Sequence, residues 1–447
     1  MPTGFVTVTI MLLSNSCNFR AILRNKSVSK LKAVAICLTL GCGLAISVNA
    51  RTIIVSNTND SGPGSLRQAL SDANNGDTID ATGISGVITL TTGELAVDKS
   101  VPINGPGADL LAVDGAMASR VFRIVVSGAT VTISGFTIRN GHAGTTGGGI
   151  DNENTSVVTI NNCTVSSNTA GLGGGIFNGG ALTIAASTVS GNSAGTGGGT
   201  YNDGAGALTI MNSTFSGNTA TPSGGGIFNI NTLLLTNSTF SGNSAGFGGG
   251  IYNLGTVQVG DTILNMSAIS SSGAVTSLGY NLSSDDGGGL LTGPGDQTNT
   301  DPLLGPLQNN GGPTFTHELL SGSPAIDTGD PGFTPPPFFD QRGSGFNRVV
   351  NGRVDIGSFE VQTQTVAIHV EASGRKVQGI NTVRLTWTGA TSSNVDVNRD
   401  GIVIATVPNT GSYIDSTGDT GRARYAYEVC EAGTSTCSNE VTVRFRH

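Results

Sequence analysis

Three acidic residues in the middle of the chain, Asp151, Glu153 and Asp203, could carry out acid–base chemistry. Hydrolysis of a glycosidic bond uses two carboxyl groups, of which one protonates the leaving oxygen and the other activates water or attacks the sugar. The two groups lie roughly 5–9.5 Å apart, so this chemistry depends on how the fold spaces them. Asp151, Glu153 and Asp203 are therefore candidate catalytic residues of a polysaccharide hydrolase. Exposed, solvated carboxylates are the alternative interpretation.

Other reactions find less support in the residue types. A lyase that removes a proton beside a uronate carboxylate uses Arg or Lys as base and charge clamp, but no Lys or Arg occurs from Asn140 to Gln341. The four histidines are too widely separated to suggest a zinc site. Asp396–Gly401 matches half of a calcium loop, but Val407 stands where the loop requires a carboxylate, and an Asp-Gly hairpin turn explains the segment better. We therefore expect no metal site and no cofactor.

Two short motifs recur about every 25 residues and define the elements that would position these side chains. The first is a glycine triplet that begins at Gly147, Gly173, Gly197, Gly224 and Gly248. The second ends at Asn168, Asn192, Asn218 and Asn243. Each unit also contains an apolar alternation such as Val158-Thr159-Ile160, which places every second side chain on one face of a strand.

A repeat of this length, with short strands and no helical period, predicts a right-handed parallel β-helix of the pectin-lyase-like class. The 68 glycines and the low charged fraction of 12% suit many tight turns and stacked uncharged side chains. Three strands of each turn would pair with the neighbouring coils, roughly 4.8 Å away. Glu153 and Asp203 share one coil position two turns apart, or roughly 10 Å, which is the upper limit for an inverting pair. Asp151 would shorten that gap.

Columns of like side chains are expected to run along the solenoid. Asparagines at two coil positions can stack as amide ladders at the bends, namely the four named above and Asn178, Asn202, Asn229 and Asn253. Aromatic residues recur at another position as Phe177, Tyr201, Phe228 and Tyr252. With the Asn, Ser and Thr columns, which we expect to be exposed, these rings suggest a stripe that contacts a sugar or a protein. In the alternative, the rings stack inside the coil.

The N-terminal region predicts export. Basic residues between 24 and 32 precede the apolar run 33–46, and Val48-Asn49-Ala50 offers small residues for cleavage. We assign 1–50 to a signal peptide region. No later segment reaches the roughly 18 apolar residues of a membrane span. The mature chain is therefore expected to be secreted or held at the cell surface, without a transmembrane span.

Beyond residue 361 the pattern changes to longer alternating strands, including Val383–Trp387 and Tyr425–Val429. Their spacing is typical of a small β-sandwich, which we assign to 366–447. Cys430 and Cys437 flank a short turn and are expected to form a disulfide in an oxidising compartment.

Several segments resemble known families. Gly64-Ser65-Leu66-Arg67-Gln68-Ala69-Leu70 resembles the opening of bacterial surface β-helix proteins, and Ser323–Asp327 with Val354–Glu360 resembles their closing segment. This resemblance implies that 51–361 is one β-helix with an N-terminal cap and a C-terminal closing segment. The sandwich, with Trp387 and Tyr427 in core positions, is similar to a fibronectin type III module.

The coils themselves resemble chlamydial polymorphic outer membrane proteins. The paired short motifs of those proteins appear here as Gly225-Gly226-Ile227 with Phe215-Ser216-Gly217-Asn218, and again as Gly249-Gly250-Ile251 with Phe240-Ser241-Gly242-Asn243. That resemblance implies a surface-displayed β-helix with a role in adhesion.

The net charge of the chain restricts the classes of partner that it can bind. A net charge of −8 at pH 7 argues against nucleic acid and anionic membranes. We expect an adhesin-like protein of the cell surface, outer membrane or extracellular space that contacts a polysaccharide or a cell-surface or matrix glycoprotein without catalysis. A polysaccharide-degrading enzyme, either a glycoside hydrolase or a pectin-lyase-like enzyme, is the alternative.

Overall fold

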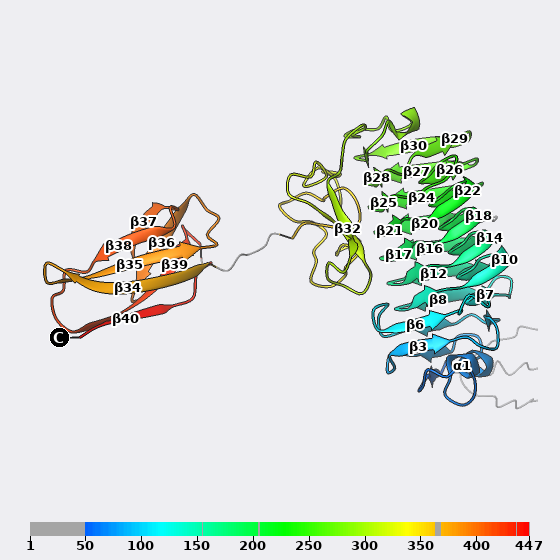
Figure 1. Cartoon of the computed structure of the whole chain (residues 1–447), viewed down its shortest axis with the longest axis horizontal. Coiled ribbons are helices and arrows are strands. Elements are labelled where there is room, and N and C mark those ends of the chain that lie inside the picture. Colours follow the sequence, from blue (N-terminus) through cyan, green and yellow to red (C-terminus); the bar gives the residue numbers. More distant parts are fainter. Residues whose placement is uncertain (1–49, 154, 204–205, 363–367, 435, 447) are drawn as a thin grey trace, which may run out of the picture. The chain divides into compact units, whose positions relative to one another are not determined.

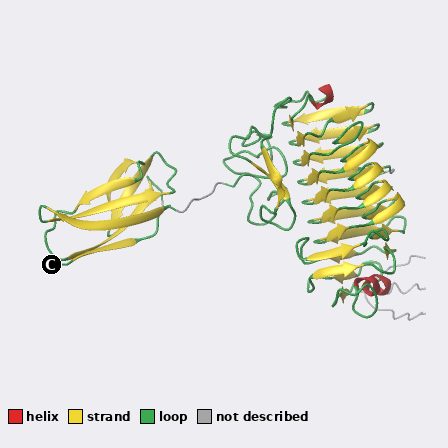
Figure 2. Cartoon of the chain, in the orientation of Figure 1, coloured by secondary structure: helices red, strands yellow, loops and turns green. Residues whose placement is uncertain are grey.

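The computed structural model describes residues 50–447 apart from 154, 204–205, 363–367, 435 and 447. The predicted signal peptide region, 1–50, therefore lies outside the described residues except for Ala50. Nearly every element is a β-strand (Figures 1 and 2). Residues 52–283 form a parallel β-helix, and antiparallel sheets follow nearer the C-terminus. This arrangement confirms the predicted fold class.

Three long parallel sheets run along the solenoid. The ten-stranded sheet contains β1 (Thr52–Ile54), β2 (Thr78–Asp80), β5 (Pro102–Asn104), β8 (Thr130–Ser134), β12 (Val157–Asn161), β16 (Ala181–Ala185), β20 (Leu208–Met211), β24 (Thr232–Thr236), β27 (Thr256–Gly260) and β30 (Ala274–Gly279). The nine-stranded sheet contains β3 (Gly86–Thr89), β6 (Leu111–Asp114), β9 (Thr137–Arg139), β13 (Thr164–Ser166), β17 (Thr188–Ser190), β21 (Thr214–Ser216), β25 (Thr239–Ser241), β28 (Ile263–Asn265) and β31 (Leu282–Ser283). The eight-stranded sheet contains β4 (Leu95–Val97), β7 (Phe122–Ile124), β11 (Ile150–Asn152), β15 (Ile176–Asn178), β19 (Thr200–Asn202), β23 (Ile227–Asn229), β26 (Ile251–Asn253) and β29 (Ile269–Ser271).

A fourth sheet occurs in the middle coils, where the repeat predicted only three strands a turn. It contains β10 (His142–Thr146), β14 (Thr169–Leu172), β18 (Ser193–Thr196) and β22 (Thr219–Ser223). Each of these strands ends at a glycine triplet, where the backbone bends into the eight-stranded sheet. At Gly173 φ is +64°, and a Cβ atom there would lie 2.3 Å from the carbonyl oxygen of Ile176. Glycine is therefore required at this bend.

Two asparagine ladders join successive coils at their bends. In the first, each Nδ2 donates to the Oδ1 of the next asparagine at 2.9–3.0 Å, through Asn168, Asn192, Asn218 and Asn243. In the second, the same bonds measure 2.7–2.8 Å, through Asn152, Asn178, Asn202, Asn229 and Asn253. All of these side chains are buried, so the expectation that the asparagine columns are exposed was wrong. Stacking offsets the cost of burying these amide groups, because the Nδ2 of each asparagine donates to a side chain of the next coil.

A short helix, α1 (Leu66–Asp72), lies beside the first coils. Ser65 caps it, because its Oγ accepts a hydrogen bond of 3.2 Å from the amide of Gln68. Leu66, Ala69 and Leu70 are buried in the same hydrophobic core as the coil strands. The helix thus shields apolar side chains beside β1 and β2, the first strands in the part of the chain that the structure describes.

The chain after β31 returns along the solenoid. We call residues 284–361 the closing segment. Its elements are a 3₁₀ turn (Gly287–Gly289), β32 (Leu304–Gln308) and β33 (Thr316–Leu319). Outward-facing threonines of the nine-stranded sheet hold it in place. Thr188 donates to the carbonyl of Phe315 at 2.6 Å, and Thr214 donates to the side chain of Gln341 at 2.6 Å. The closing segment therefore covers part of that sheet.

The C-terminal part consists of two antiparallel sheets. The three-stranded sheet contains β34 (His369–Val377), β35 (Ile380–Thr388) and β38 (Ser412–Ser416). The four-stranded sheet contains β37 (Ile402–Pro408), β36 (Asn394–Arg399), β39 (Ala423–Glu431) and β40 (Val441–Phe445). Side chains of both sheets share one hydrophobic core that includes Trp387 and Tyr427, so the sheets form a small sandwich.

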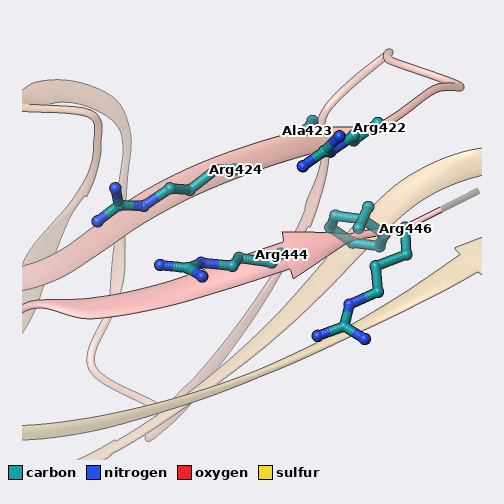
Figure 3. A pocket seen from close by; sticks show the side chains of 6 residues that line it. Arg422, Ala423, Arg424, Arg444 and Arg446 are labelled. Carbon is teal, nitrogen blue, oxygen red and sulfur yellow. The ribbon is translucent and has the colours of Figure 1, made fainter.

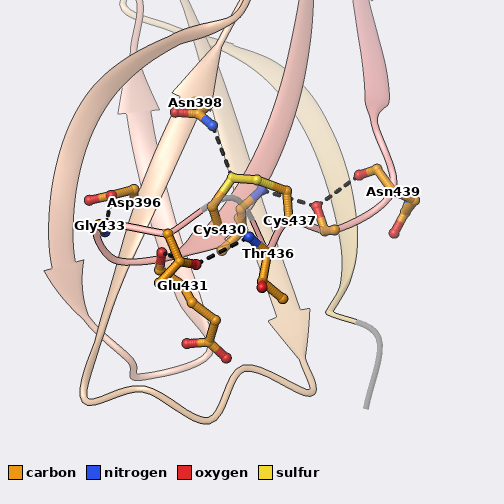
Figure 4. Close-up of a disulfide and its surroundings, with 11 residues drawn as sticks. Asp396, Asn398, Cys430, Glu431, Gly433, Thr436, Cys437 and Asn439 are labelled. Atoms are coloured by element: carbon orange, nitrogen blue, oxygen red, sulfur yellow. Dashed lines mark hydrogen bonds between the residues drawn. A yellow bond between two sulfur atoms is a disulfide. The ribbon is translucent and has the colours of Figure 1, made fainter. Parts of the chain in front are cut away.

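Two details of the sandwich bear on the sequence analysis. Asp400 and Gly401 both have positive φ, 53° and 80°, in the two-residue turn between β36 and β37. This is the Asp-Gly hairpin turn preferred to a calcium loop. Cys430 and Cys437 form a disulfide, and Asn398 Nδ2 lies 3.1 Å from the sulfur of Cys430 (Figure 4). The disulfide ties the end of β39 to the segment that leads into β40.

Candidate functional site

The four predicted aromatic residues lie on the outer face of the eight-stranded sheet. In β15 the flanking residues Ile176 and Asn178 point into the coil and are buried, whereas Phe177 between them is half-buried. The strand register then places the other rings in line through Tyr201, Phe228 and Tyr252. The alternative, in which these rings stack inside the coil, was therefore wrong, because Ile and Asn occupy the inward positions. We call the four residues the aromatic ladder.

The rings of the aromatic ladder stack on one another. Successive ring centroids are 5.5, 4.9 and 5.3 Å apart, and the planes differ by only 14–15°. The parallel strands impose this arrangement, since their spacing is roughly 4.8 Å. Each inner ring therefore has both faces covered by neighbouring rings, and its edge remains for contact. Burial, with a smaller contribution from the charge of Asp203, raises the pKa of Tyr201, so that its hydroxyl stays protonated at neutral pH.

The glycine bends allow the chain to pass close to the ladder. A Cβ atom at Gly173 would lie 2.8 Å from the amide nitrogen of Phe177, and one at Gly197 would lie 3.0 Å from the Cα atom of Tyr201. A larger residue at either position would push the preceding strand away from the ladder. The glycine triplets thus set the path of the backbone beside each ring.

The same column continues into a cluster of charges at the N-terminal side of the ladder. Asp151 pairs in register with Phe177 on one side and with Arg123 on the other. Arg120 lies within 2.9 Å of Asp151 and 2.6 Å of Glu94. Arg123 contacts Glu94 at 3.4 Å and Glu153 at 2.9 Å. We call the group the arginine–carboxylate cluster, composed of Glu94, Arg120, Arg123, Asp151 and Glu153.

Asp151 is fully buried within this cluster. Burial raises the pKa of its carboxyl, while the charge of Arg120 and a 2.8 Å hydrogen bond from Thr146 oppose the rise. Its Oδ1 atom has no hydrogen-bond partner among the described residues. A carboxyl in this position cannot reach a polymer in solution, so the geometry gives Asp151 a structural role.

The other two catalytic candidates are also separated from any common substrate position. Both oxygens of Glu153 accept hydrogen bonds from Arg123 Nη2, at 2.9 Å. Asp203 is exposed and directly follows β19. Strand β15 lies between β19 and β11, the strand that contains Asp151. The structure thus brings Asp151 and Glu153 into one ion-paired cluster and leaves Asp203 outside it.

Sequence reasoning missed the arginines of this cluster. The absence of Lys and Arg between Asn140 and Gln341 obscured the role of Arg120 and Arg123, which belong to the coil just before that stretch. The repeat contained the missing signal, because counting one coil back from Asp151 reaches Arg123. A coil position must therefore be compared with its neighbours in both directions along the solenoid.

A second group of acidic residues gathers in the closing segment. Asp327, Asp355 and Glu360 place carboxylate oxygens within 4.8 Å of one another. Backbone amides already engage two of them: Asp355 accepts from Asp327 and Val361 at 2.7 and 2.6 Å, and Glu360 accepts from Asp355 at 2.8 Å. Burial raises the pKa of Asp355 to about 6 and that of Glu360 to about 8. These carboxyl groups organise the turns of the closing segment.

A family model matches part of the coil pattern. The model of the Chlamydia polymorphic membrane protein repeat matches residues 212–230 and 237–254, which include Phe228 and Tyr252 of the aromatic ladder. This match confirms the resemblance to polymorphic membrane protein repeats. The crystal structure of pectate lyase Pel9A is similar over 70% of this chain and 96% of its own, with 15% sequence identity and a TM-score of 0.37. No curated protein matches the chain.

Fold and repeats together define a class. The chain is a parallel β-helix protein with repeats of the polymorphic membrane protein type. Among the residues that the structure describes, no helix is long and apolar enough to cross a membrane.

Proposed function

We propose that this protein is exported to the cell surface and contacts a polysaccharide or a matrix glycoprotein through the aromatic ladder, without catalysis. The observation that carries the proposal is the stack of four half-buried rings on the outer face of the solenoid. Rings that already hold one another lose little conformational freedom when a ligand binds. A ligand lying along the solenoid axis meets the ring edges in succession and finds hydrogen-bonding hydroxyls at Tyr201 and Tyr252.

The proposed location draws support from two sources. The matched repeats take their description from a membrane protein family, and the N-terminal sequence has the pattern of an export signal. Adhesion to a surface or matrix is the role that these features favour for a long, rigid solenoid.

We also propose that the chain consists of two domains. Residues 51–361 would act as one β-helix with its cap and closing segment, and 366–447 as a fibronectin type III-like module. The shared core of the two antiparallel sheets, with Trp387 and Tyr427 buried, supports the second assignment.

The arginine–carboxylate cluster argues against the alternative of a polysaccharide hydrolase. A general acid or nucleophile must contact the scissile bond, whereas Asp151 is buried and Glu153 is paired with Arg123. Asp203 alone is exposed, and one carboxylate does not make an acid–base pair.

A glycan array and a cell-adhesion assay test the proposal on the chain from Arg51 to His447. The test variant replaces Tyr201 and Phe228 with threonine, which suits a strand and already occupies outer positions of these coils. We expect the double variant to fold and to bind the recognised glycan at least about tenfold more weakly, a loss of roughly 1.4 kcal/mol.

Phe247→Thr is the matched control. Phe247 is 62% exposed and has no ring partner in the described part of the chain, so its loss should change affinity less than about twofold. Absence of binding to glycans and cells by the unaltered chain would contradict the proposed function. Equal loss of binding in control and ladder variants would contradict the role of the ladder.

A further inference from the structure

The sandwich carries a cluster of four arginines on one face of its four-stranded sheet. Arg424 lies in β39 and Arg422 immediately precedes that strand. Arg444 lies in β40 and Arg446 immediately follows it (Figure 3). All four are exposed. Together with Phe445 they line an open pocket of about 800 Å³. We call them the arginine cluster.

Like charges face one another directly in this cluster. Arg424 and Arg444 are cross-strand partners in the antiparallel register of β39 and β40. Two cations at such positions repel and destabilise the pair of strands. Alternation along a strand puts Arg422 beside Arg424 on the same face, roughly 7 Å along, while cross-strand partners are roughly 5 Å apart. The result is a small grid of positive charges.

Carboxylates do not neutralise this grid. Within the described residues, none of the four guanidinium groups has an ion pair or a hydrogen bond, in contrast to Arg399 of the same sheet, which pairs with Asp415 at 2.8 Å. The carboxylate of Asp400 accepts a 2.8 Å hydrogen bond from the backbone amide of Ala426, two residues from Arg424, and forms no ion pair with the cluster. Glu428 lies four residues beyond Arg424 on β39, or roughly 13 Å away. Residues 366–447 contain eight basic and eight acidic residues, so half of the basic side chains gather at this one place.

The surroundings of the cluster distinguish between anionic partners. The aromatic side chains next to the cluster, Tyr425 and Phe445, are only 6% and 7% exposed, so they offer little ring surface to stack on nucleic acid bases. The adjacent outward residues are Ala426 and Thr442, which offer no large apolar side chain to insert into a membrane. The cluster therefore presents only positive charge to a ligand. Such a surface suits a flexible polymer with regularly spaced anionic groups.

We infer that the arginine cluster binds an acidic polysaccharide whose sugar units carry carboxylates, each guanidinium group pairing with a carboxylate of the polymer. Guanidinium groups form strong, paired hydrogen bonds with carboxylates. This site is separate from the aromatic ladder and goes beyond the proposed function, because it concerns the sandwich and an anionic ligand. The overall charge of −8 excludes general attraction of polyanions, so binding must be local.

Polygalacturonate is the probe, with a neutral glucan, duplex DNA and anionic vesicles as comparison ligands. Binding to the chain from Arg51 to His447 is measured at about 50 and 300 mM salt, because release of counterions makes such binding weaken with salt. The test variant is Arg424→Gln with Arg444→Gln. We expect at least about a tenfold loss of polygalacturonate affinity and a shallower dependence on salt.

Arg375→Gln with Arg384→Gln is the matched control, since it removes the same charge from the other sheet, and it should change affinity less than about twofold. Thermal unfolding verifies that the test variant folds, and we expect its stability to be equal or higher because a repulsive pair has gone. Failure of the unaltered chain to bind polygalacturonate, equal weakening in the control, or stronger binding to DNA or to vesicles would each overturn the inference. Ladder variants serve as a separate check, because they should leave polygalacturonate binding through the sandwich intact.

Discussion

At the scale of single residues, the most consequential contact in the solenoid is the ion pair of Arg120 with buried Asp151. A buried carboxylate that loses its cation keeps the full cost of leaving water. Arg120→Ala should therefore lower the free energy of unfolding by about 3–5 kcal/mol, measured by urea denaturation. Arg123→Ala, whose partner Glu153 is one-third exposed, should cost about 1 kcal/mol or less. A small effect of Arg120→Ala would show that Asp151 is neutral in the folded protein.

The acidic residues of the closing segment make stability depend on pH. Burial, reinforced by the charge of Asp355, raises the pKa of Glu360 from about 4.5 to about 8. Between these values the folded chain holds a proton that the unfolded chain has released, so stability falls as pH rises. Asp355, with a pKa of about 6, acts in the same direction.

We expect the melting temperature to fall by at least about 3 °C between pH 5 and pH 8.5. Glu360→Gln should reduce this dependence of the melting temperature on pH. The substitution can also change the stability at every pH, because the Glu360 carboxyl accepts hydrogen bonds from the backbone amides of Val350 and Asp355. Glu431, whose pKa is lowered to about 2, titrates below this window and serves as a residue whose replacement leaves the slope unchanged. A melting temperature that stays constant or rises over the interval would contradict the assignment.

At the scale of elements, the asparagine ladders decide how the coils stay in register. Asn202 accepts from Asn178 and donates to Asn229, at 2.8 and 2.7 Å. Asn202→Ala leaves a buried donor and a buried acceptor without partners, and each costs about 1–3 kcal/mol. We expect a loss of about 2–4 kcal/mol in chemical denaturation. Thr183→Ala, on the outer face of β16, should cost under about 0.5 kcal/mol, and similar losses in both variants would contradict the ladder's role.

The strands show how far sequence reasoning reaches. The period of the glycine and asparagine motifs sufficed to predict the β-helix, because the inward side chains of each coil must repeat with the coil. The direction of the Ile176-Phe177-Asn178 strand was harder to predict, since simple hydrophobicity favours burying Phe over Asn. The structure buries Asn178 because neighbouring amides satisfy it, and Phe177 then has to point outward.

The candidate site was predicted only in part for a related reason. The aromatic column follows from the repeat, so Phe177, Tyr201, Phe228 and Tyr252 were found together. Arg120 and Arg123 lie in a coil that lacks the glycine triplet, and no motif linked them to Asp151. The fourth sheet was missed as well, because β14 and β18 are short and rich in small residues with little apolar alternation.

At the scale of the whole molecule, the closing segment is attached to the solenoid through a polar contact centred on Gln341. Its amide donates to Thr188 at 2.9 Å and its oxygen accepts from Thr214 at 2.6 Å, all three being buried. Gln341→Ala should remove both of these hydrogen bonds and loosen the segment, although Thr188 keeps its bond to Phe315 and Thr214 its contact with Ser358.

Hydrogen exchange checks this expectation. Backbone amides of the closing segment should exchange at least about tenfold faster in Gln341→Ala, whereas those of the middle coils should keep their rates. Uniform acceleration along the solenoid would contradict an independent closing segment, and unchanged rates would mean that other contacts hold it.

The central claim is that the solenoid binds its ligand through the aromatic ladder and leaves it intact. The most direct measurement incubates the chain from Arg51 to His447 with an immobilised polysaccharide or matrix glycoprotein that it recognises, and quantifies both the bound protein and the release of reducing ends or unsaturated products. We predict retention without release, and loss of retention in the Tyr201→Thr, Phe228→Thr variant but not in Phe247→Thr. Release of sugar fragments that disappears when Asp151, Glu153 and Asp203 are replaced by Ala would contradict the claim and establish a degrading enzyme.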